Sequence, residues 1–258
     1  MHIKELFDLS GRVAIVTGGS VGLGQQMGIA LAEAGANVVL AARKVERCEA
    51  AADKIKKELG VKAIPVRCDV SKWEDVENLV ATTLKEFGKI DILVNNAGAT
   101  WGAPAVDYPL KGWQKVIDVN INGTWFCCQQ VGRVMIDQKR GKIINIASLA
   151  AFVGAEPEAM DAVAYQTSKG GVVALTRDLA VKWARYNINV NAIAPGWFPT
   201  DMTDFTLQKS GEILLRYIPM RRFGQDDELK GAVVYLASDA SSYVTGHTLC
   251  VDGGYVIV

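Results

Sequence analysis

Short apolar runs alternate with longer helix-like segments along the whole chain, and this alternation restricts the fold more than any other feature. The runs are rich in Val, Ile and Leu and are nearly continuous, which is typical of strands buried on both faces. Strands that alternate with helices favour a parallel sheet covered by helices on both sides. We expect strands at residues 13–16, 37–42, 63–67, 90–95, 142–147, 188–193 and 248–251.

The segments between these runs predict helices. We expect them at residues 25–33, 45–59, 71–87, 112–135, 165–184 and 228–238, with Ser71 as the N-cap of the third. Neither a Pro/Ser-rich linker nor a charge run divides the 258 residues. The sequence therefore predicts one α/β domain over residues 1–258, a doubly wound Rossmann-type parallel sheet of about seven strands. In such sheets, ligands bind at the carboxyl ends of the strands.

Composition excludes several classes of function. The chain has 28 basic and 28 acidic residues and a formal net charge of zero, so no excess of positive charge favours nucleic acid or an anionic membrane. No apolar run approaches the ~18 residues of a membrane span, and the N-terminus is too polar for a signal peptide, so we expect a cytoplasmic protein.

The residues that usually hold metals or form disulfides are few and scattered. The only histidines, His2 and His247, lie in no metal or Ser-His-Asp pattern, so we expect no metal site. The five cysteines have neither disulfide nor metal spacing, and we expect them to be reduced and mostly buried.

A glycine-rich loop follows the first expected strand. Residues 17–24 read Thr-Gly-Gly-Ser-Val-Gly-Leu-Gly and lead directly into the first expected helix. Glycines allow a tight turn and a close backbone approach to a pyrophosphate that rests on the helix N-terminus. In this strand–loop–helix setting, the loop predicts a dinucleotide site that includes Gly18, Ser20, Gly22, Leu23 and Gly24.

The end of the second expected strand indicates which dinucleotide binds. NAD selectivity usually requires a carboxylate there for the ribose 2′-hydroxyl, and Ala42 supplies none. Arg43 instead offers a planar guanidinium suited to a 2′-phosphate, and Lys44 follows it. The sequence therefore favours NADP(H), with NAD as the alternative. Stacking on adenine or exposure to solvent are the other roles open to Arg43.

A Tyr-x-x-x-Lys pair opens the fifth expected helix. Side chains four residues apart share a helix face, so Lys169 is expected beside Tyr165. An ammonium beside a phenol favours the phenolate and lowers a pKa that starts near ~10, which makes the tyrosine a usable proton donor or acceptor. The pair alone is a weak signal, because most helical pairs of this kind are surface decoration.

Several ordered motifs together resemble the short-chain dehydrogenase/reductase family over essentially the whole chain. Besides the glycine loop and the Tyr-Lys pair, they are Cys68-Asp69-Val70, Asn95-Asn96-Ala97-Gly98, Asp118-Val119-Asn120, Ile146-Ala147-Ser148, residues 191–200 with Pro195-Gly196, and residues 245–247 and 251–254. Within the family, the chain resembles 3-oxoacyl thioester reductases and gluconate 5-dehydrogenase-like members. The resemblance implies reversible hydride transfer between a nicotinamide and a carbonyl carbon.

The resemblance also implies roles for individual residues. Tyr165 would exchange a proton with the substrate oxygen, Ser148 would stabilise charge on that oxygen, and Lys169 would lower the pKa of Tyr165 and bind the nicotinamide ribose. Asn120 would hold a water of the proton relay through its backbone, and Asn95 would tie strands together. Besides the glycine loop, Arg43 and Lys44, the cofactor would contact Asp69, Val70, Asn96, Ala97, Gly98, Tyr165, Lys169, Pro195, Gly196, Phe198, Thr200 and Met202.

Two segments are expected to border the substrate. Residues 149–164 form a longer connection than in many relatives, and residues 197–223 match a mobile lid. The acidic residues of the first segment either bind a polar or cationic group of the substrate or face solvent. The apolar residues of the lid favour a medium-sized, partly hydrophobic ketone over a sugar. The expected substrate contacts are Ser148, Trp101, Ala150, Glu156, Trp197 and Phe205.

The sequence thus favours an NADP(H)-dependent oxidoreductase that interconverts a ketone and a secondary alcohol, with a 3-oxoacyl thioester as the small-molecule substrate. Action on a sugar acid is the alternative enzyme activity. A dinucleotide-sensing protein without turnover is the alternative of another class. The resemblance also implies a homo-oligomer, with a tetramer favoured over a dimer, and the apolar tail at 255–258 suits a contact between subunits.

Overall fold

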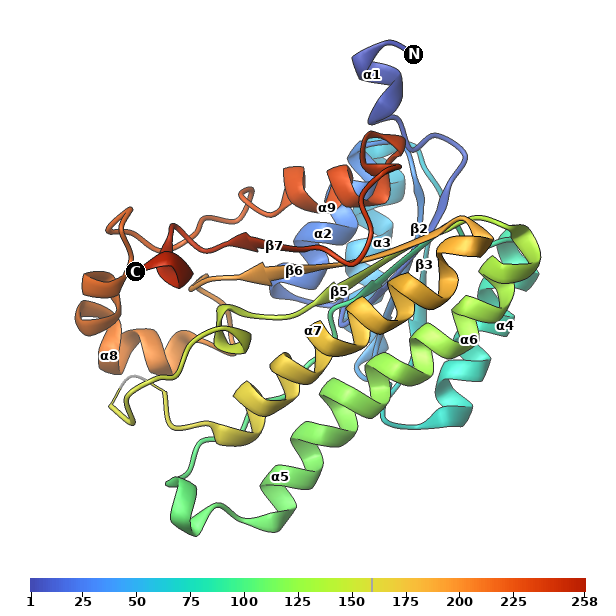
Figure 1. Cartoon of the computed structure of the whole chain (residues 1–258). Coiled ribbons are helices and arrows are strands. Elements are labelled where there is room, and N and C mark those ends of the chain that lie inside the picture. Colours follow the sequence, from blue (N-terminus) through green and yellow to red (C-terminus); the bar gives the residue numbers. More distant parts are fainter. Residues whose placement is uncertain (159) are drawn as a thin grey trace.

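Seven parallel strands form one sheet at the centre of the computed structural model, which describes residues 1–158 and 160–258. The strand order is β3-β2-β1-β4-β5-β6-β7, so the direction of winding reverses between β1 and β4. Figure 1 shows β5, β6 and β7 side by side. This is the doubly wound sheet predicted from the sequence. The strands are β1 (Val13–Thr17), β2 (Asn37–Ala42), β3 (Ala63–Arg67), β4 (Ile92–Asn95), β5 (Gly141–Ile146), β6 (Ile188–Pro195) and β7 (Thr248–Val251).

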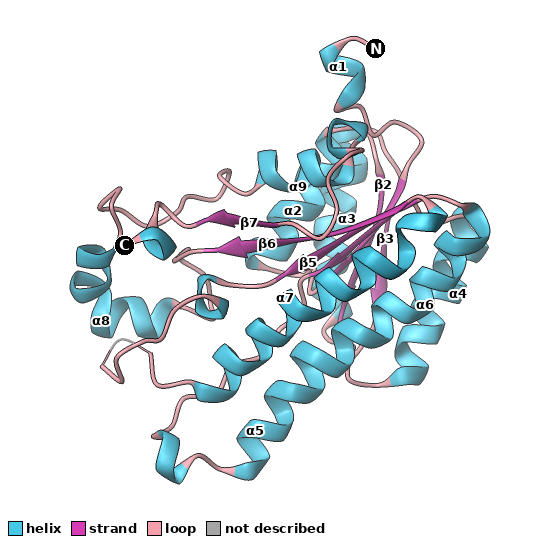
Figure 2. Cartoon of the chain, viewed as in Figure 1, coloured by secondary structure: helices cyan, strands magenta, loops and turns pink. Residues whose placement is uncertain are grey.

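Helices cover both faces of the sheet (Figure 2). One face carries α2 (Gly22–Glu33), α3 (Val45–Leu59) and α9 (Lys230–Ala237), and the other carries α4 (Trp73–Phe87), α6 (Gly123–Gln138) and α7 (Val163–Trp183). Alternate strand side chains enter the two apolar cores. Ala14 and Val16 pack in the core under α2, and Ile15 packs in the core under α6. This double burial explains why the strands are apolar at nearly every position.

The other elements are α1 (Ile3–Leu6), α5 (Leu110–Ile117), α8 (Asp204–Tyr217) and the short turns η1 (Ala105–Asp107), η2 (Asp118–Asn122), η3 (Leu149–Ala151), η4 (Ala184–Tyr186), η5 (Asp239–Ser241) and η6 (Tyr255–Ile257). Helix α8 lies beyond the carboxyl ends of β6 and β7 (Figure 1). The sequence predicted a lid in this segment but did not predict its helix. Leu207 and Leu214 of α8 pack with Trp197 and Ile218 in a separate small apolar cluster, which holds the helix on the body.

The expected helix at 112–135 is interrupted. It divides into α5, the π turn η2 and α6, because a wider turn is inserted around Asn120. The prediction of Ser71 as an N-cap is also wrong. The Ser71 hydroxyl donates to the carboxylate of Asp69 at 2.7 Å, and α4 begins two residues later, with Lys72 at the N-cap.

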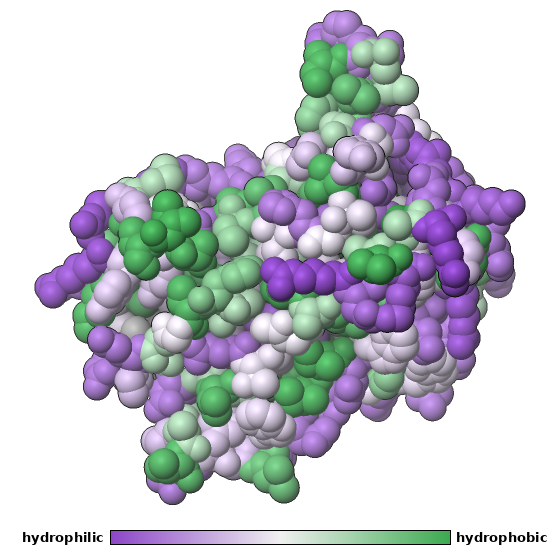
Figure 3. All heavy atoms as spheres, viewed as in Figure 1, coloured by the Kyte–Doolittle hydropathy of each residue, from purple (hydrophilic) through white to green (hydrophobic). Residues whose placement is uncertain are grey.

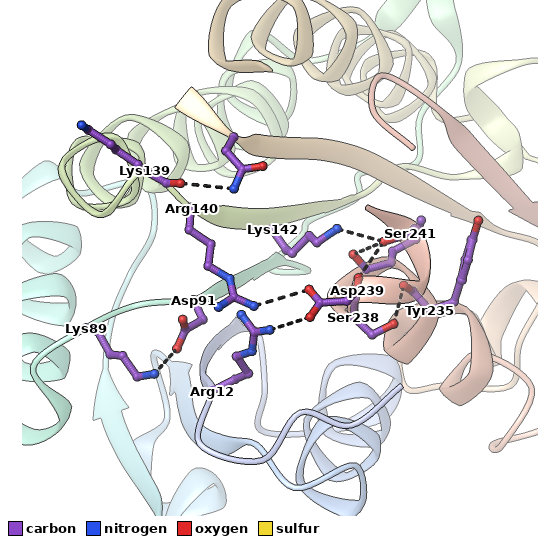
Figure 4. Close-up of polar contacts among 12 residues, drawn as sticks. Arg12, Lys89, Asp91, Lys139, Arg140, Lys142, Tyr235, Ser238, Asp239 and Ser241 are labelled. Atoms are coloured by element: carbon purple, nitrogen blue, oxygen red, sulfur yellow. Dashed lines mark hydrogen bonds and ion pairs between the residues drawn. The ribbon is translucent and has the colours of Figure 1, made fainter. Parts of the chain in front are cut away.

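A polar network ties the elements together at the amino ends of the strands, opposite the expected ligand crevice (Figure 4). Asp239 of η5 accepts hydrogen bonds from Arg12 at 3.0 Å and from Arg140 at 3.4 Å. Lys142 of β5 donates to the hydroxyl of Ser241 at 3.2 Å, and burial lowers the pKa of Lys142 to about 8. The network joins β1 and β5 to the turn that follows α9.

Two further observations concern the chain as a whole. The cysteines are free, four of them are buried, and Cys250 is partly exposed. Among residues 1–158 and 160–258, no helix combines the length and the apolar character that crossing a membrane requires.

Candidate active site

A cavity of about 800 Å³ runs along the carboxyl ends of the strands. It extends from the glycine loop after β1, past the end of β2, to the residues that follow β5 and β6. Every residue expected to contact the cofactor lines it. These residues are Gly18, Ser20, Gly22, Leu23, Gly24, Arg43, Lys44, Asp69, Val70, Asn96, Ala97, Gly98, Tyr165, Lys169, Pro195, Gly196, Phe198, Thr200 and Met202.

Gly18 and Gly24 of the glycine loop have no room for a side chain. Gly18 and Gly22 have φ angles of +65° and +55°, which favour glycine. A Cβ added to Gly24 would lie 2.2 Å from the carbonyl oxygen of Gly18 and 2.3 Å from Nδ2 of Asn96. The loop therefore presents bare backbone at the N-terminus of α2, which fits the close approach of a pyrophosphate.

Asn96 and Thr17 hold this loop against the end of β4. The Asn96 amide donates to the carbonyl oxygens of Thr17 and Gly18 at 3.1 and 3.2 Å. The buried Thr17 hydroxyl accepts from the backbone N–H groups of Asn96 and Ala97, both at 3.1 Å. Sequence reasoning missed Thr17. The sequence feature that could have indicated Thr17 is a single hydroxyl at the end of an otherwise apolar strand.

Positive charge gathers where β2 enters α3. Arg43 and Lys44 are exposed at the cavity, and in the part of the chain that the structure describes neither forms an ion pair. Arg47, in the first turn of α3, lines the same cavity and lies 3.9 Å from the carboxylate of Asp201. Sequence reasoning missed Arg47, which follows Arg43 by only four residues.

Ser148, Tyr165 and Lys169 meet in this cavity from two elements. Ser148 directly follows β5, and the other two project from α7. Lys169 is buried, and its ammonium donates to the carbonyl oxygen of Ile146 at 2.6 Å. The same nitrogen lies 5.6 Å from the centre of the Tyr165 ring. The hydrogen bond fixes α7 against the end of β5 and holds Lys169 next to the phenol.

The pKa values differ from the sequence-based expectation. Burial raises the pKa of Tyr165, and a hydrogen bond with the Ser148 side chain opposes this rise. Burial also lowers the pKa of Lys169 to about 8. In this structure, burial therefore keeps the pKa of the phenol above its usual value although Lys169 lies beside it. The site holds a protonated phenol beside the Ser148 hydroxyl, an arrangement able to donate a proton to a carbonyl oxygen.

Asn120 lies behind the cavity and is not among the described residues that line it. Its side chain accepts from the N–H of Ala99 at 2.8 Å and donates to the carbonyl oxygen of Ala99 at 3.0 Å. It also donates to the hydroxyl of Ser168 at 2.9 Å, and that hydroxyl donates to the carbonyl oxygen of Tyr165 at 2.7 Å. Asn120 thus joins the loop after β4 to the first turn of α7.

Ser168 is a functional candidate that sequence reasoning missed. It is fully buried and links Asn120 to the backbone of Tyr165. The sequence feature that could have indicated Ser168 is its position three residues after Tyr165, on the same helix face. Asn95, by contrast, has the bridging role that the resemblance implied, since its amide donates to Asn145 of the neighbouring strand at 2.9 Å.

A second cavity of about 560 Å³ opens beside the first. The two cavities share Ser148, Tyr165, Gly196, Met202 and Thr203. The walls of the second come from α8, from residues 100–103 and from residues 149–162, although Ala159 lies outside the described residues. Of the expected substrate contacts, Ser148, Ala150, Trp197 and Phe205 line it.

Trp101 and Glu156 were expected here and lie elsewhere. The ring of Trp101 packs on Gly112 of α5, where an added Cβ would lie 2.7 Å from the ring. Glu156 is exposed on its loop, and Glu158 and Asp161 line the cavity instead. Lys209 of α8 also lines it and was missed, because only the helix shows which lid side chains point inward.

The described residues contain no group of three or more His, Cys, Asp or Glu side chains that could hold a metal ion. The polar side chains shared by the two cavities are those of Ser148, Tyr165 and Thr203.

Comparisons with known proteins identify the family. A family model described as "Enoyl-(Acyl carrier protein) reductase" matches residues 18–256. The chain is 40% identical to a 3-oxoacyl-[acyl-carrier-protein] reductase of Synechocystis sp., over 96% of this chain and 98% of that one.

Two of the similar solved structures each match 100% of this chain and 100% of their own chain. One is a short-chain type dehydrogenase/reductase from Mycobacterium marinum, with 39% identity and a TM-score of 0.96. The other is a gluconate 5-dehydrogenase from Burkholderia cenocepacia J2315 in complex with NADP and tartrate, with 36% identity and a TM-score of 0.94. At these identities and over nearly the whole length, the protein belongs to the short-chain dehydrogenase/reductase family of NAD(P)-dependent oxidoreductases.

Proposed function

We propose that this protein uses NADP(H) to interconvert a ketone and a secondary alcohol. One observation carries the proposal: the long cavity beside the glycine loop and the smaller cavity under α8 meet at Ser148 and Tyr165. A dinucleotide in the first cavity and a carbonyl compound in the second would share this junction. The groups that handle a proton therefore stand where the two molecules would meet.

The cofactor, when bound, supplies the hydride, and the chain supplies positions and protons. Tyr165 would donate a proton to the substrate oxygen or accept one from the alcohol. Ser148 would donate a hydrogen bond to the same oxygen and stabilise its developing charge. Lys169, held by the carbonyl of Ile146, would bind the nicotinamide ribose. Asn120 would act as a positioning residue through Ala99 and Ser168.

The preference for NADP(H) over NAD(H) rests on the positive charge at the end of β2. Ala42 offers no carboxylate to a ribose 2′-hydroxyl, whereas Arg43, Lys44 and Arg47 line the cavity there. Two guanidinium groups and an ammonium suit a 2′-phosphate. The Burkholderia cenocepacia relative, whose structure includes NADP, supports the same choice.

The lining of the second cavity favours a polar substrate. Its walls include Glu158, Asp161, Lys209 and the hydroxyls of Thr203 and Thr206, which suit the hydroxyl and carboxylate groups of a sugar acid. The gluconate 5-dehydrogenase relative supports this class. The apolar lid residues, from which the sequence favoured a 3-oxoacyl thioester, therefore make up only part of the cavity wall.

A 3-oxoacyl thioester is the second candidate substrate. Leu149, Met160 and Trp197 form an apolar part of the same wall, against which an acyl chain could pack. The Synechocystis relative supports this class.

Replacement of Tyr165 by Phe tests the reaction. Tyr165→Phe removes the proton donor and keeps the ring, so we expect turnover to fall by at least about 10²-fold. NADPH affinity, followed by nucleotide fluorescence, is expected to stay within about twofold, since most cofactor contacts remain. Full activity in this variant would contradict the proposed mechanism.

An assay of NADPH oxidation with 5-ketogluconate and acetoacetyl-coenzyme A, side by side, separates the two substrate classes. We expect the higher kcat/KM with 5-ketogluconate. Absence of turnover across a broad panel of ketones and alcohols, with NADPH still bound, would instead support a dinucleotide-sensing protein.

The cytoplasmic location and the homo-oligomer remain predictions. Ile257 and Val258 at the C-terminal tail are exposed, at 82% and 78%. Apolar atoms gather at the place where Figure 1 shows the C-terminal turn (Figure 3). This tail is the segment expected to contact another subunit, and sedimentation of the protein tests whether it forms a tetramer or a dimer.

A further inference from the structure

Helix α8 turns one face toward the second cavity. Thr206, Lys209 and Ser210 of this face line it, together with Phe205. Lys209 is the only cationic side chain among the described residues that line this cavity. In the same part of the chain it has no carboxylate within ion-pair distance and no hydrogen-bond partner. An ammonium is thus presented to the substrate space without a partner from the protein.

The negative charges of the cavity come from a different segment of the chain. Glu158 and Asp161 lie on the segment that follows η3. The buried hydroxyl of Ser210 donates to the carbonyl oxygen of Glu158 at 2.6 Å, and the N–H of Ala103 donates to the carbonyl oxygen of Asp161 at 3.0 Å. These backbone hydrogen bonds fasten the acidic segment to α8 and to the loop after β4.

The opposite charges of Lys209 and of the two acids influence the orientation of an anionic substrate in the cavity. Glu158 and Asp161 repel a carboxylate, and Lys209 attracts it. The reacting carbon must stay at Ser148 and Tyr165, where the two cavities join. The negative end of the substrate is therefore attracted toward Lys209, while its hydroxyl groups can donate to the two carboxylates.

We propose that Lys209 binds the carboxylate of a keto acid or hydroxy acid and determines the specificity of this protein for such substrates. The inference rests on the proposed oxidoreductase function and narrows its substrate class. It assigns Glu158 the opposite effect, which is to weaken the binding of the same anions.

The test compares a ladder of keto acids with their neutral methyl esters. The probes are 4-oxopentanoate, 5-oxohexanoate and 6-oxoheptanoate, each with its ester, and kcat/KM is read from NADPH oxidation. In the wild-type protein, we expect kcat/KM for the acid to exceed that for its ester by about tenfold at one chain length. That chain length indicates the distance between the reacting carbonyl at Tyr165 and the ammonium of Lys209. Lys209→Met should abolish this preference and leave kcat/KM for the esters within about twofold.

Two variants sharpen the result. Lys57→Met removes the same charge from an exposed position of α3 that lines neither cavity, and it should keep the preference for acids. Glu158→Gln should increase the preference for acids by about two- to fivefold, because it removes a repulsive charge. Opposite signs for Lys209→Met and Glu158→Gln, with no change for Lys57→Met, support the proposal.

The outcomes separate this inference from the proposed function. Turnover of the esters with an acid-to-ester ratio that Lys209→Met leaves unchanged overturns the role of Lys209 and leaves the reaction standing. If no probe is turned over, the proposed reaction fails. The affinities of the same acids and esters for the NADPH complex, read from quenching of NADPH fluorescence, then decide: a ratio independent of Lys209 overturns the inference, and a ratio that Lys209→Met abolishes supports it.

Discussion

At the scale of single residues, Gly24 shows how little space the cofactor cavity leaves. The Cβ of an alanine would lie 2.2 Å from the carbonyl oxygen of Gly18, which no small shift relieves. We expect Gly24→Ala to weaken NADPH binding by at least about tenfold, because the loop must open away from Asn96. A fluorescence titration with NADPH measures the change.

A matched glycine serves as the control for this prediction. Gly231 in α9 has no heavy atom within 4 Å of an added Cβ. Gly231→Ala should leave NADPH binding unchanged and raise the free energy of unfolding by up to about 1 kcal/mol, through helix propensity. Equal NADPH affinities of the two alanine variants would contradict the lack of space described for Gly24.

Cofactor choice is also decided by single residues. The double variant Ala42→Asp, Arg43→Ile supplies a carboxylate for a ribose 2′-hydroxyl and removes a guanidinium that suits a 2′-phosphate. We expect the ratio of kcat/KM for NADPH over NADH to fall by at least about tenfold. If that ratio does not move, the assignment of the NADP-selective contact to Arg43 is wrong.

At the scale of elements, the connection between η2 and α7 determines how the catalytic candidates are held. Asn120 and Ser168, 48 residues apart in sequence, are joined by a buried hydrogen bond of 2.9 Å. The same hydroxyl reaches the carbonyl oxygen of Tyr165, so one serine supports both the π turn and the first turn of α7.

Ser168→Ala is expected to lower both stability and turnover. The variant leaves a buried amide hydrogen of Asn120 without this acceptor, which costs about 1–3 kcal/mol of unfolding free energy. We expect kcat to fall several-fold with little change in the KM for NADPH, because Tyr165 shifts while the glycine loop does not. Urea denaturation and steady-state kinetics measure the two effects.

Thr167→Ala is the neighbouring control. Thr167 is exposed, and its hydroxyl donates only to the carbonyl of Val163 within the same helix. Its loss should change the unfolding free energy by no more than about 0.5 kcal/mol. A loss of turnover as large as that of Ser168→Ala would show that the effect does not pass through Asn120.

Elements of regular periodicity were predictable, and those that depend on distant contacts were not. The seven strands lie within two residues of their expected bounds, because nearly continuous apolar runs reflect burial on both faces. Helix α8 was missed because its apolar residues serve a small cluster with Trp197, and the π turn was missed because it depends on contacts of Asn120 with Ala99 and Ser168.

At the scale of the whole molecule, the two ends of the sheet have different tasks. The carboxyl ends bear the cavities, and the amino ends bear the network of Arg12, Arg140, Lys142 and Asp239 (Figure 4). Lys142 is partly buried beside Arg12, and burial lowers its pKa from 10.5 to about 8. This residue links the stability of the fold to pH without touching the active site.

The pH dependence has a definite sign. Between about pH 8 and pH 10.5, the unfolded chain keeps a proton on Lys142 that the folded protein has released. The unfolding free energy therefore rises with pH through this residue in that window. Lys142→Met removes this contribution, so the wild-type protein should gain stability relative to the variant between pH 7.5 and pH 10.

Urea denaturation of both proteins across this pH range measures the difference. The other groups that titrate there, including Lys169, are common to the two proteins and cancel in the comparison. A difference in unfolding free energy that stays constant from pH 7.5 to pH 10 would contradict the lowered pKa of Lys142.

The sequence by itself determined the parallel sheet, the glycine loop and the placing of Ser148 at the carboxyl end of a strand. Those features depend on local periodicity and on the short-range geometry of a strand, a turn and a helix. The tertiary structure alone decided that Trp101 turns to α5, that Lys209 faces the second cavity and that the pKa of Tyr165 is raised. These outcomes depend on burial and on contacts between segments far apart in the chain, which no local pattern contains.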